Sequence, residues 1–159
     1  MTVQVFGFGL LILSAISLSV SLIRRANQRL SELEELCRLI SHIRNNIEAF
    51  MMPLSDIFRS FEPHQDAVKE FLSMAEHNGF QYAADHAQLS VGGEGKRILG
   101  EFAEKIGAGY REDELRLCTY TLNMMNELLN AEKDEHSKRL KLYKTLPVMS
   151  ALSVALLLL

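Results

Sequence analysis

Charge is segregated along this chain of 159 residues. The 17 basic and 20 acidic side chains all lie between Arg24 and Lys144, so residues 1–23 and 146–159 carry no charged side chain. A terminal helix of a water-soluble domain normally keeps a charged or polar face toward solvent, and these two segments are almost wholly apolar. The pattern therefore predicts three parts: an N-terminal transmembrane helix at 1–23, a central domain at 24–145, and a C-terminal membrane segment at 146–159.

The first apolar segment is long enough to cross a membrane. Val3–Ile23 contains Gln4 as its only large polar residue, and a helix of this length spans roughly 30 Å, the thickness of the hydrocarbon core. The alternative is a cleaved signal peptide, but such peptides carry positive charge before the apolar run, whereas Arg24, Arg25 and Arg29 follow it here. Arginines after the helix predict that the chain beyond them stays in the cytoplasm.

The C-terminal apolar segment is shorter. Residues 146–159 span roughly 21 Å as a helix, and a start at Leu142, with Lys144 reaching to the membrane interface, lengthens the segment. The basic residues that precede it are Lys138, Arg139, Lys141 and Lys144. They agree with the first basic cluster in placing both termini outside and residues 24–145 in the cytoplasm. The alternative is a tail that folds back as a buried helix of the central domain.

Two seams of apolar residues organise the central domain. The first seam is Leu33, Leu36, Ile40, Ile43, Ile47 and Phe50, and the second is Leu115, Cys118, Leu122, Met125 and Leu129. A spacing of three and four residues places each set on one face of a helix. Because one long helix leaves the membrane and the other returns to it, the two are expected to be antiparallel.

Shorter helices are expected between the two long ones. Their predicted ranges are Leu54–Phe61, Gln65–His77, Phe80–Leu89 and Glu94–Ile106. Proline and glycine residues between these ranges indicate turns, and no stretch shows the alternation of a β-strand. The predicted fold is therefore all-α, an antiparallel multi-helix bundle between two membrane-anchoring helices.

No residue pattern in the sequence predicts catalytic chemistry. The five histidines have no metal-ligand spacing, and Cys37 and Cys118 fall on the seams, where small core residues are expected. Gly92–Arg97 lacks the first glycine and the hydroxyl residue of a phosphate loop, so we expect a flexible connector there. A net charge of −3 provides no basic field for nucleic acid. We expect no catalytic, cofactor-binding or metal site, and interpret the chain as a structural or assembly component.

The order of three features resembles a known family. The first is the outline of a membrane helix followed by basic residues, a helical domain and an apolar C-terminus. The second is Ile47–Phe58, where a glutamate, an aromatic residue and a Pro-Leu pair precede an acidic and an apolar residue. The third is Phe102–Gly107 with an acidic helix start after it, and later Lys141–Pro147. Together they resemble the stage III sporulation protein AB family across the whole chain.

The resemblance implies a location and a partner. It implies a mother-cell membrane protein that faces the forespore, similar in its central domain to the cytoplasmic domain of type II secretion platform proteins. Such a platform works with a secretion ATPase, and the AA protein of the same sporulation operon is similar to one. The implied function is to anchor or couple this ATPase to a secretion-like channel, together with other channel components. A homo-oligomer stays open, and no nucleic-acid partner is expected.

The candidate partner interface is the helix corner around Pro53. It comprises Glu48, Phe50, Met51, Pro53, Leu54, Asp56 and Phe58. Large apolar residues rimmed by charge suit a transient interface, and this corner ends the first long helix far from its membrane segment. The alternative is purely structural: Pro53 and Leu54 turn the chain, Phe50 and Phe58 fill the core, and Glu48 caps the next helix.

Two functions of other classes stay open. A membrane-bound helical signalling or sensor module would need a ligand pocket or an attached output domain. A membrane enzyme would need a cluster of polar residues within or beside its membrane helices. The sequence displays neither feature.

Overall fold

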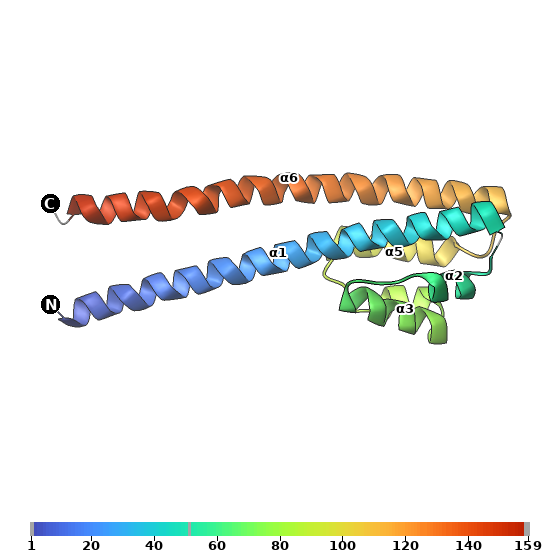
Figure 1. Ribbon diagram of the computed structural model, residues 1–159, viewed down its shortest axis with the longest axis horizontal. Coiled ribbons are helices and arrows are strands. Elements are labelled where there is room, and N and C mark those ends of the chain that lie inside the picture. The colour runs from blue at the N-terminus through green and yellow to red at the C-terminus, as the bar shows by residue number, and fades with distance from the viewer. Residues whose placement is uncertain (1, 51, 158–159) are drawn as a thin grey trace. The chain divides into compact units, whose positions relative to one another are not determined.

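The computed structural model describes the backbone of residues 2–50 and 52–157, and the side chains of residues 20, 21, 23–50 and 52–139. The helices in this part of the chain are α1 (Thr2–Phe50), α2 (Leu54–Ser60), α3 (Asp66–Asn78), α4 (Phe80–His86), α5 (Gly92–Lys105) and α6 (Arg111–Leu157) (Figure 1). The described backbone contains no strand. The prediction of an all-α fold is confirmed.

The chain divides into two compact units, residues 28–131 and residues 1–27 together with 132–159. The membrane segments predicted at 1–23 and 146–159 belong to the second unit, and among them only Val20, Ser21 and Ile23 have described side chains. Where side chains are described, no helix is both long and apolar enough to cross a membrane. Almost all side chains of the two predicted membrane segments lie outside the described residues. Both membrane segments therefore stay predictions.

Within residues 28–131, the last part of α1 lies antiparallel to the first part of α6 (Figure 1). Arg111, at the start of α6, donates from Nε to Ile47 O over 3.4 Å and from Nη2 to Glu48 O. Carbonyls in the last turn of a helix have no partner inside it, and a cation there also suits the helix dipole. Arg111 therefore caps the end of α1 and joins it to α6.

The first seam forms the centre of this unit, with one exception. Leu33, Leu36, Ile40 and Ile43 have no exposed surface, as the spacing predicts. The prediction that Phe50 is the last buried member of the seam is wrong, because 72% of its surface is exposed. The heptad spacing continues to Phe50, but α1 ends there and the Phe50 side chain, unlike that of Ile47, is not covered by a described helix.

The second seam is displaced by one residue over part of its length. Cys118, Met125 and Leu129 are buried as predicted, but Leu115 and Leu122 are only half-buried. Glu114 and Thr121 are buried instead, which makes the buried stripe Glu114, Cys118, Thr121, Met125 and Leu129. Thr121 Oγ1 donates to Leu117 O over 2.9 Å, so its hydroxyl keeps a hydrogen bond inside the core.

Four phenylalanines join the short helices to each other. The Phe80 ring lies 5.1 Å from that of Phe58 on α2, 5.3 Å from that of Phe71 on α3, and 5.7 Å from that of Phe102 on α5, measured between centroids. These separations suit stacked and edge-to-face aromatic pairs. On the surface, Arg59 Nε also donates to Glu76 Oε1 over 2.7 Å, which connects α2 to α3.

Two of the short helices differ from their predicted ranges by more than one residue. Helix α4 ends at His86 instead of Leu89, while Leu89 and Val91 still contribute buried side chains to the core. The connector predicted at Gly92–Arg97 is wrong, because α5 begins at Gly92. A Cβ atom on Gly95 would lie 3.0 Å from Val91 Cβ, so this glycine leaves room for the Val91 side chain, which precedes α5.

Candidate functional site

The cysteines and histidines form no ligand cluster in the described part of the chain. No group of His, Cys, Asp and Glu side chains there could hold a metal ion. Cys37 and Cys118 are buried and form no disulfide, as expected for core residues. Burial, with a smaller effect of the Glu114 carboxylate, raises the pKa of the Cys118 thiol to about 12. A thiol with such a pKa stays protonated at neutral pH and is a poor nucleophile.

The most conspicuous polar groups of the unit are three buried glutamates that hold connecting segments. Glu32, Glu35 and Glu114 are 1%, 5% and 7% exposed. Each accepts hydrogen bonds from backbone N–H groups of a connection between two helices. Buried carboxylates are costly unless such donors surround them. We refer to these three residues as the connection-holding glutamates.

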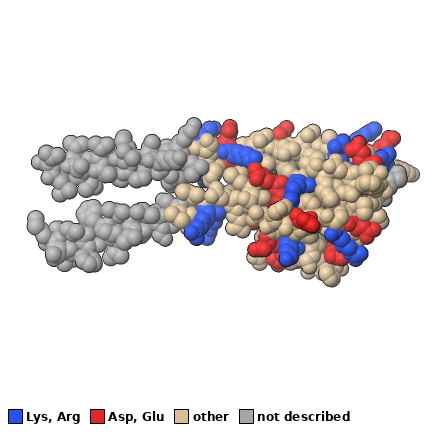
Figure 2. All heavy atoms as spheres, in the orientation of Figure 1, with Lys and Arg blue, Asp and Glu red and all other residues tan. Residues whose placement is uncertain are grey.

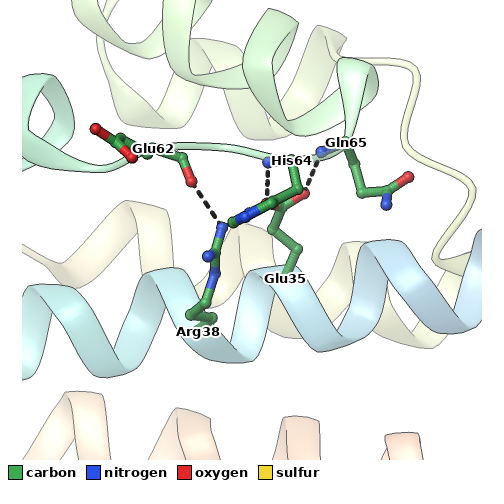
Figure 3. Close-up of polar contacts among 5 residues, drawn as sticks. All are labelled: Glu35, Arg38, Glu62, His64 and Gln65. Atoms are coloured by element: carbon green, nitrogen blue, oxygen red, sulfur yellow. Dashed lines mark hydrogen bonds and ion pairs between the residues drawn. The ribbon is translucent and has the colours of Figure 1, made fainter.

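Glu35 holds the connection between α2 and α3 (Figure 3). Its Oε1 accepts from the backbone N–H of His64, and its Oε2 accepts from that of Gln65 over 2.7 Å. Arg38 Nη2 donates to Glu35 Oε1 over 2.6 Å and to Glu62 O over 2.7 Å. The Arg38 guanidinium also lies 4.7 Å from the centre of the Phe61 ring. These contacts fix the connection to α1.

A surface depression of about 270 Å³ lies over this cluster, lined by Ser31, Glu34, Glu35, Arg38, His64 and Gln65. The Glu35 carboxylate in it is already occupied by the two N–H groups and by Arg38, and His64 Nδ1 lies 3.4 Å from Oε1. The Glu35 carboxylate at this depression therefore stabilises the fold.

Glu32 holds the other end of the α3–α4 pair. Its Oε2 accepts from the backbone N–H of Ser90, which follows α4, and its Oε1 accepts from Gln28 Nε2 over 2.9 Å. Glu32 and Glu35 are one turn apart on α1. The segment that contains α3 and α4 is thus attached to α1 at its entrance, beside Gln65, and at its exit, beside Ser90.

Glu114 holds the connection between α5 and α6. Its carboxylate accepts from the backbone N–H of Gly107 over 2.9 and 3.0 Å and from that of Gly109 over 2.8 Å. Gly107 has a φ of 86°, and a Cβ atom there would lie 3.0 Å from Leu54 Cδ1. The α5–α6 connection therefore requires glycine and packs against the first residue of α2.

The predicted partner interface is split between surface and core. Glu48, Phe50, Pro53 and Asp56 are exposed, and Leu54 is half-buried against Gly107. Phe58 is buried and stacks on Phe80, as in the structural alternative, so it does not face solvent. Met51 lies outside the described residues. Whether the exposed members bind a partner stays a prediction.

A second exposed aromatic residue lies on the neighbouring connection. Tyr110, directly before α6, is 84% exposed, which is the largest value among the exposed large apolar side chains of the described residues. Tyr110 is not among the predicted interface residues because the prediction covers only the helix corner around Pro53. The preceding glycine-rich stretch, Gly107–Gly109, is a signal of an exposed turn and could have drawn attention to it.

Surface charge is mixed over the face of the unit that Figure 2 shows. Acidic and basic side chains alternate across it, and no extended area carries a single sign. Specific nucleic-acid binding relies on a clustered basic surface. The visible face offers no such cluster.

Fold and polar contacts together define an all-helical protein whose buried polar side chains fix the connections between helices. The family model for stage III sporulation protein AB matches residues 4–159, and the chain belongs to this family of sporulation proteins. No curated protein and no solved structure matches the chain.

Proposed function

We propose that this sporulation protein is a non-enzymatic, membrane-anchored assembly component of a secretion-like channel. In this proposal it sits in the mother-cell membrane facing the forespore and anchors or couples a secretion-type ATPase there. Family membership supports the sporulation role. The resemblance to type II secretion platform proteins, read from the sequence, supports the ATPase as partner.

Membrane anchoring rests on the charge pattern. All charged residues lie between Arg24 and Lys144, and basic residues stand at both boundaries of the central part. Such clusters stay on the cytoplasmic side of a membrane. The proposal therefore places residues 24–145 in the mother-cell cytoplasm, where an ATPase has access to ATP.

The observation that carries the proposal is the exposed end of α1. Phe50 is 72% exposed and lies between the exposed acids Glu48 and Asp56 in sequence. Burial of a large aromatic residue in an interface is favourable, and exposed aromatic anchors with a charged rim are typical of protein interfaces. A partner surface that covers Phe50 would gain this free energy.

A pull-down with the operon's ATPase tests the proposal. The variant Glu48→Ala with Asp56→Ala should retain less ATPase than the unchanged chain, because two charges of the rim are lost. The matched control is Glu70→Ala with Asp85→Ala, two exposed acids on α3 and α4. Equal retention by both double variants would remove Glu48 and Asp56 from the interface, and no retention by the unchanged chain would overturn the ATPase coupling.

A further inference from the structure

One stretch of α6 is poor in charge although one of its faces is exposed. Residues 117–131 contain a single charged side chain, Glu127, whereas five of the six residues 111–116 are charged. The exposed residues of the stretch are Thr119, Tyr120, Asn123, Asn126, Glu127, Asn130 and Ala131. A solvent-facing helix surface normally carries charge, and the centre of a protein interface is depleted of it. The stretch therefore has the composition of an interface.

Three asparagines follow one line along this exposed face. Asn123, Asn126 and Asn130 are spaced three and four residues apart, which places them on the same side of α6. All three are exposed, whereas Cys118 and Met125 on the inner side of the helix are buried. We refer to the three residues as the asparagine stripe.

The fold of a single chain gives the asparagine stripe no role. No hydrogen bond joins its three side-chain amides to any described residue. Asparagine is also a weak helix former, because its amide competes for backbone hydrogen bonds in other conformations. Three asparagines within eight residues therefore disfavour the helix in an isolated chain. A contact that uses their amides would explain their presence.

The chemistry of the stripe suits a second copy of the same chain. A side-chain amide both donates and accepts, so an asparagine is complementary to the same asparagine of another copy. A symmetric contact brings identical patches together, and along the stripe it brings no like charges together. The charges lie at the margins: Glu127 is beside the stripe, and Arg116 precedes it, where a long side chain can reach solvent.

We infer that two copies of this chain pair through α6, with the asparagine stripe at the centre of the contact and the exposed Tyr120 at its side. The inference rests on the proposed function in one respect: two copies anchored in the same membrane present α6 in the same direction. The pair is therefore parallel, and each asparagine meets its own counterpart. An asparagine in the seam between two helices also specifies such a register.

Cysteine cross-linking of the full-length chain in lipid vesicles tests the pairing. Asn123→Cys and Asn130→Cys should each give a disulfide-linked dimer on mild oxidation, because a parallel pair brings equivalent Cβ atoms to about 4 Å. The matched control is Ser73→Cys, an exposed position on α3, which should give much less dimer. The unchanged chain, with two buried cysteines, provides the background.

Sedimentation of the full-length chain in detergent measures the same association without a cross-link. The Asn123→Lys and Asn130→Lys double variant should raise the dissociation constant of the dimer roughly tenfold or more, because four positive charges meet in the contact. Lysine forms helix more readily than asparagine, so the double variant should fold, and a melting curve verifies this. Ser73→Lys is the control and should associate as the unchanged chain does.

The possible results separate this inference from the proposed function. An unchanged chain that stays monomeric, or a lysine double variant that associates equally well, would overturn the pairing and leave the ATPase coupling untouched. Equal cross-linking at residues 73, 123 and 130 would also overturn it, because random collisions would then account for the dimers. Cross-linking at 123 without cross-linking at 130 would indicate an antiparallel pair and contradict the parallel arrangement.

Discussion

The connection-holding glutamates show how single side chains determine the position of whole segments. Glu35 accepts two backbone N–H groups and an arginine, and Glu114 accepts the N–H groups of two glycines. Without the carboxylate, these donors would be left partly buried without a partner, which costs more than the hydrogen bonds themselves contribute. The residues stabilise the fold because each carboxylate is surrounded by donors.

Removing the Glu35 carboxylate should therefore destabilise the chain. Glu35→Ala leaves the N–H groups of His64 and Gln65 without their acceptor, and the free energy of unfolding should fall by about 2–4 kcal/mol. Glu70→Ala, an exposed acid on α3, should change it by less than about 0.5 kcal/mol. Denaturant titrations of both variants provide the comparison. Equal stability of the two would contradict the role assigned to Glu35.

The buried Cys118 thiol predicts a loss of stability at alkaline pH. Its pKa is raised from 9.0 to about 12 by burial and by Glu114. Between these values the unfolded thiol loses its proton while the folded one keeps it, so the folded state binds more protons and the free energy of unfolding falls as pH rises. Cys118→Ala should lose less stability between pH 9 and pH 12 than the unchanged chain. Parallel pH profiles would show that the thiol is accessible to water.

At the scale of the helices, most residues of the apolar seams of α1 and α6 are buried, as their spacing predicts. Ile43 is fully buried, and Leu122 is half-buried because Thr121 occupies the interior position. The same substitution at these two residues should therefore have different effects. Their comparison tests the displaced seam on α6.

We expect Ile43→Asp to lower the free energy of unfolding by about 3–5 kcal/mol, because it buries an unpaired charge. Leu122→Asp should cost about 1–2 kcal/mol, since its carboxylate can reach solvent. Thermal melting of the two variants measures the difference. A larger effect at Leu122 than at Ile43 would show that Leu122, and not Thr121, faces the core.

Much of the helix arrangement could be predicted from local spacing. The burial of the α1 seam from Leu33 to Ile47 follows from the spacing of residues within α1 alone. The burial of Cys118 and Met125 follows in the same way from the spacing within α6. The exposure of Phe50 could not be predicted this way, because the spacing does not indicate where the covering helix begins. The choice of Thr121 over Leu122 depends on how α6 is rotated against its neighbours, which hydrophobicity alone does not determine.

The connection-holding glutamates lie beyond the reach of pattern analysis for a related reason. Glu32 bonds to the backbone of Ser90, and Glu35 to that of His64 and Gln65. Their partners are backbone groups far away in sequence, so no side-chain motif marks them. Tyr110 escapes prediction because exposure, unlike burial, has no periodic signal.

For the full chain, the proposed function requires residues 24–145 to lie in the cytoplasm. Both native cysteines are buried, so they are poor labelling sites, and an exposed residue such as Ser73 on α3 suits the test. The Ser73→Cys variant should react with a membrane-impermeant maleimide only after the cells are opened. The chain without the substitution provides the background. Labelling of the Ser73→Cys variant on intact cells would place α3 outside.

Recruitment of a secretion-type ATPase to a membrane by this family member can be measured by vesicle sedimentation. The full-length chain is reconstituted into lipid vesicles, and the purified ATPase of the same operon is added. We predict that the ATPase sediments with these vesicles, and that empty vesicles or vesicles with the Phe50→Ser variant retain much less. An ATPase that sediments equally with empty vesicles and with vesicles carrying the unchanged chain would contradict recruitment by this protein.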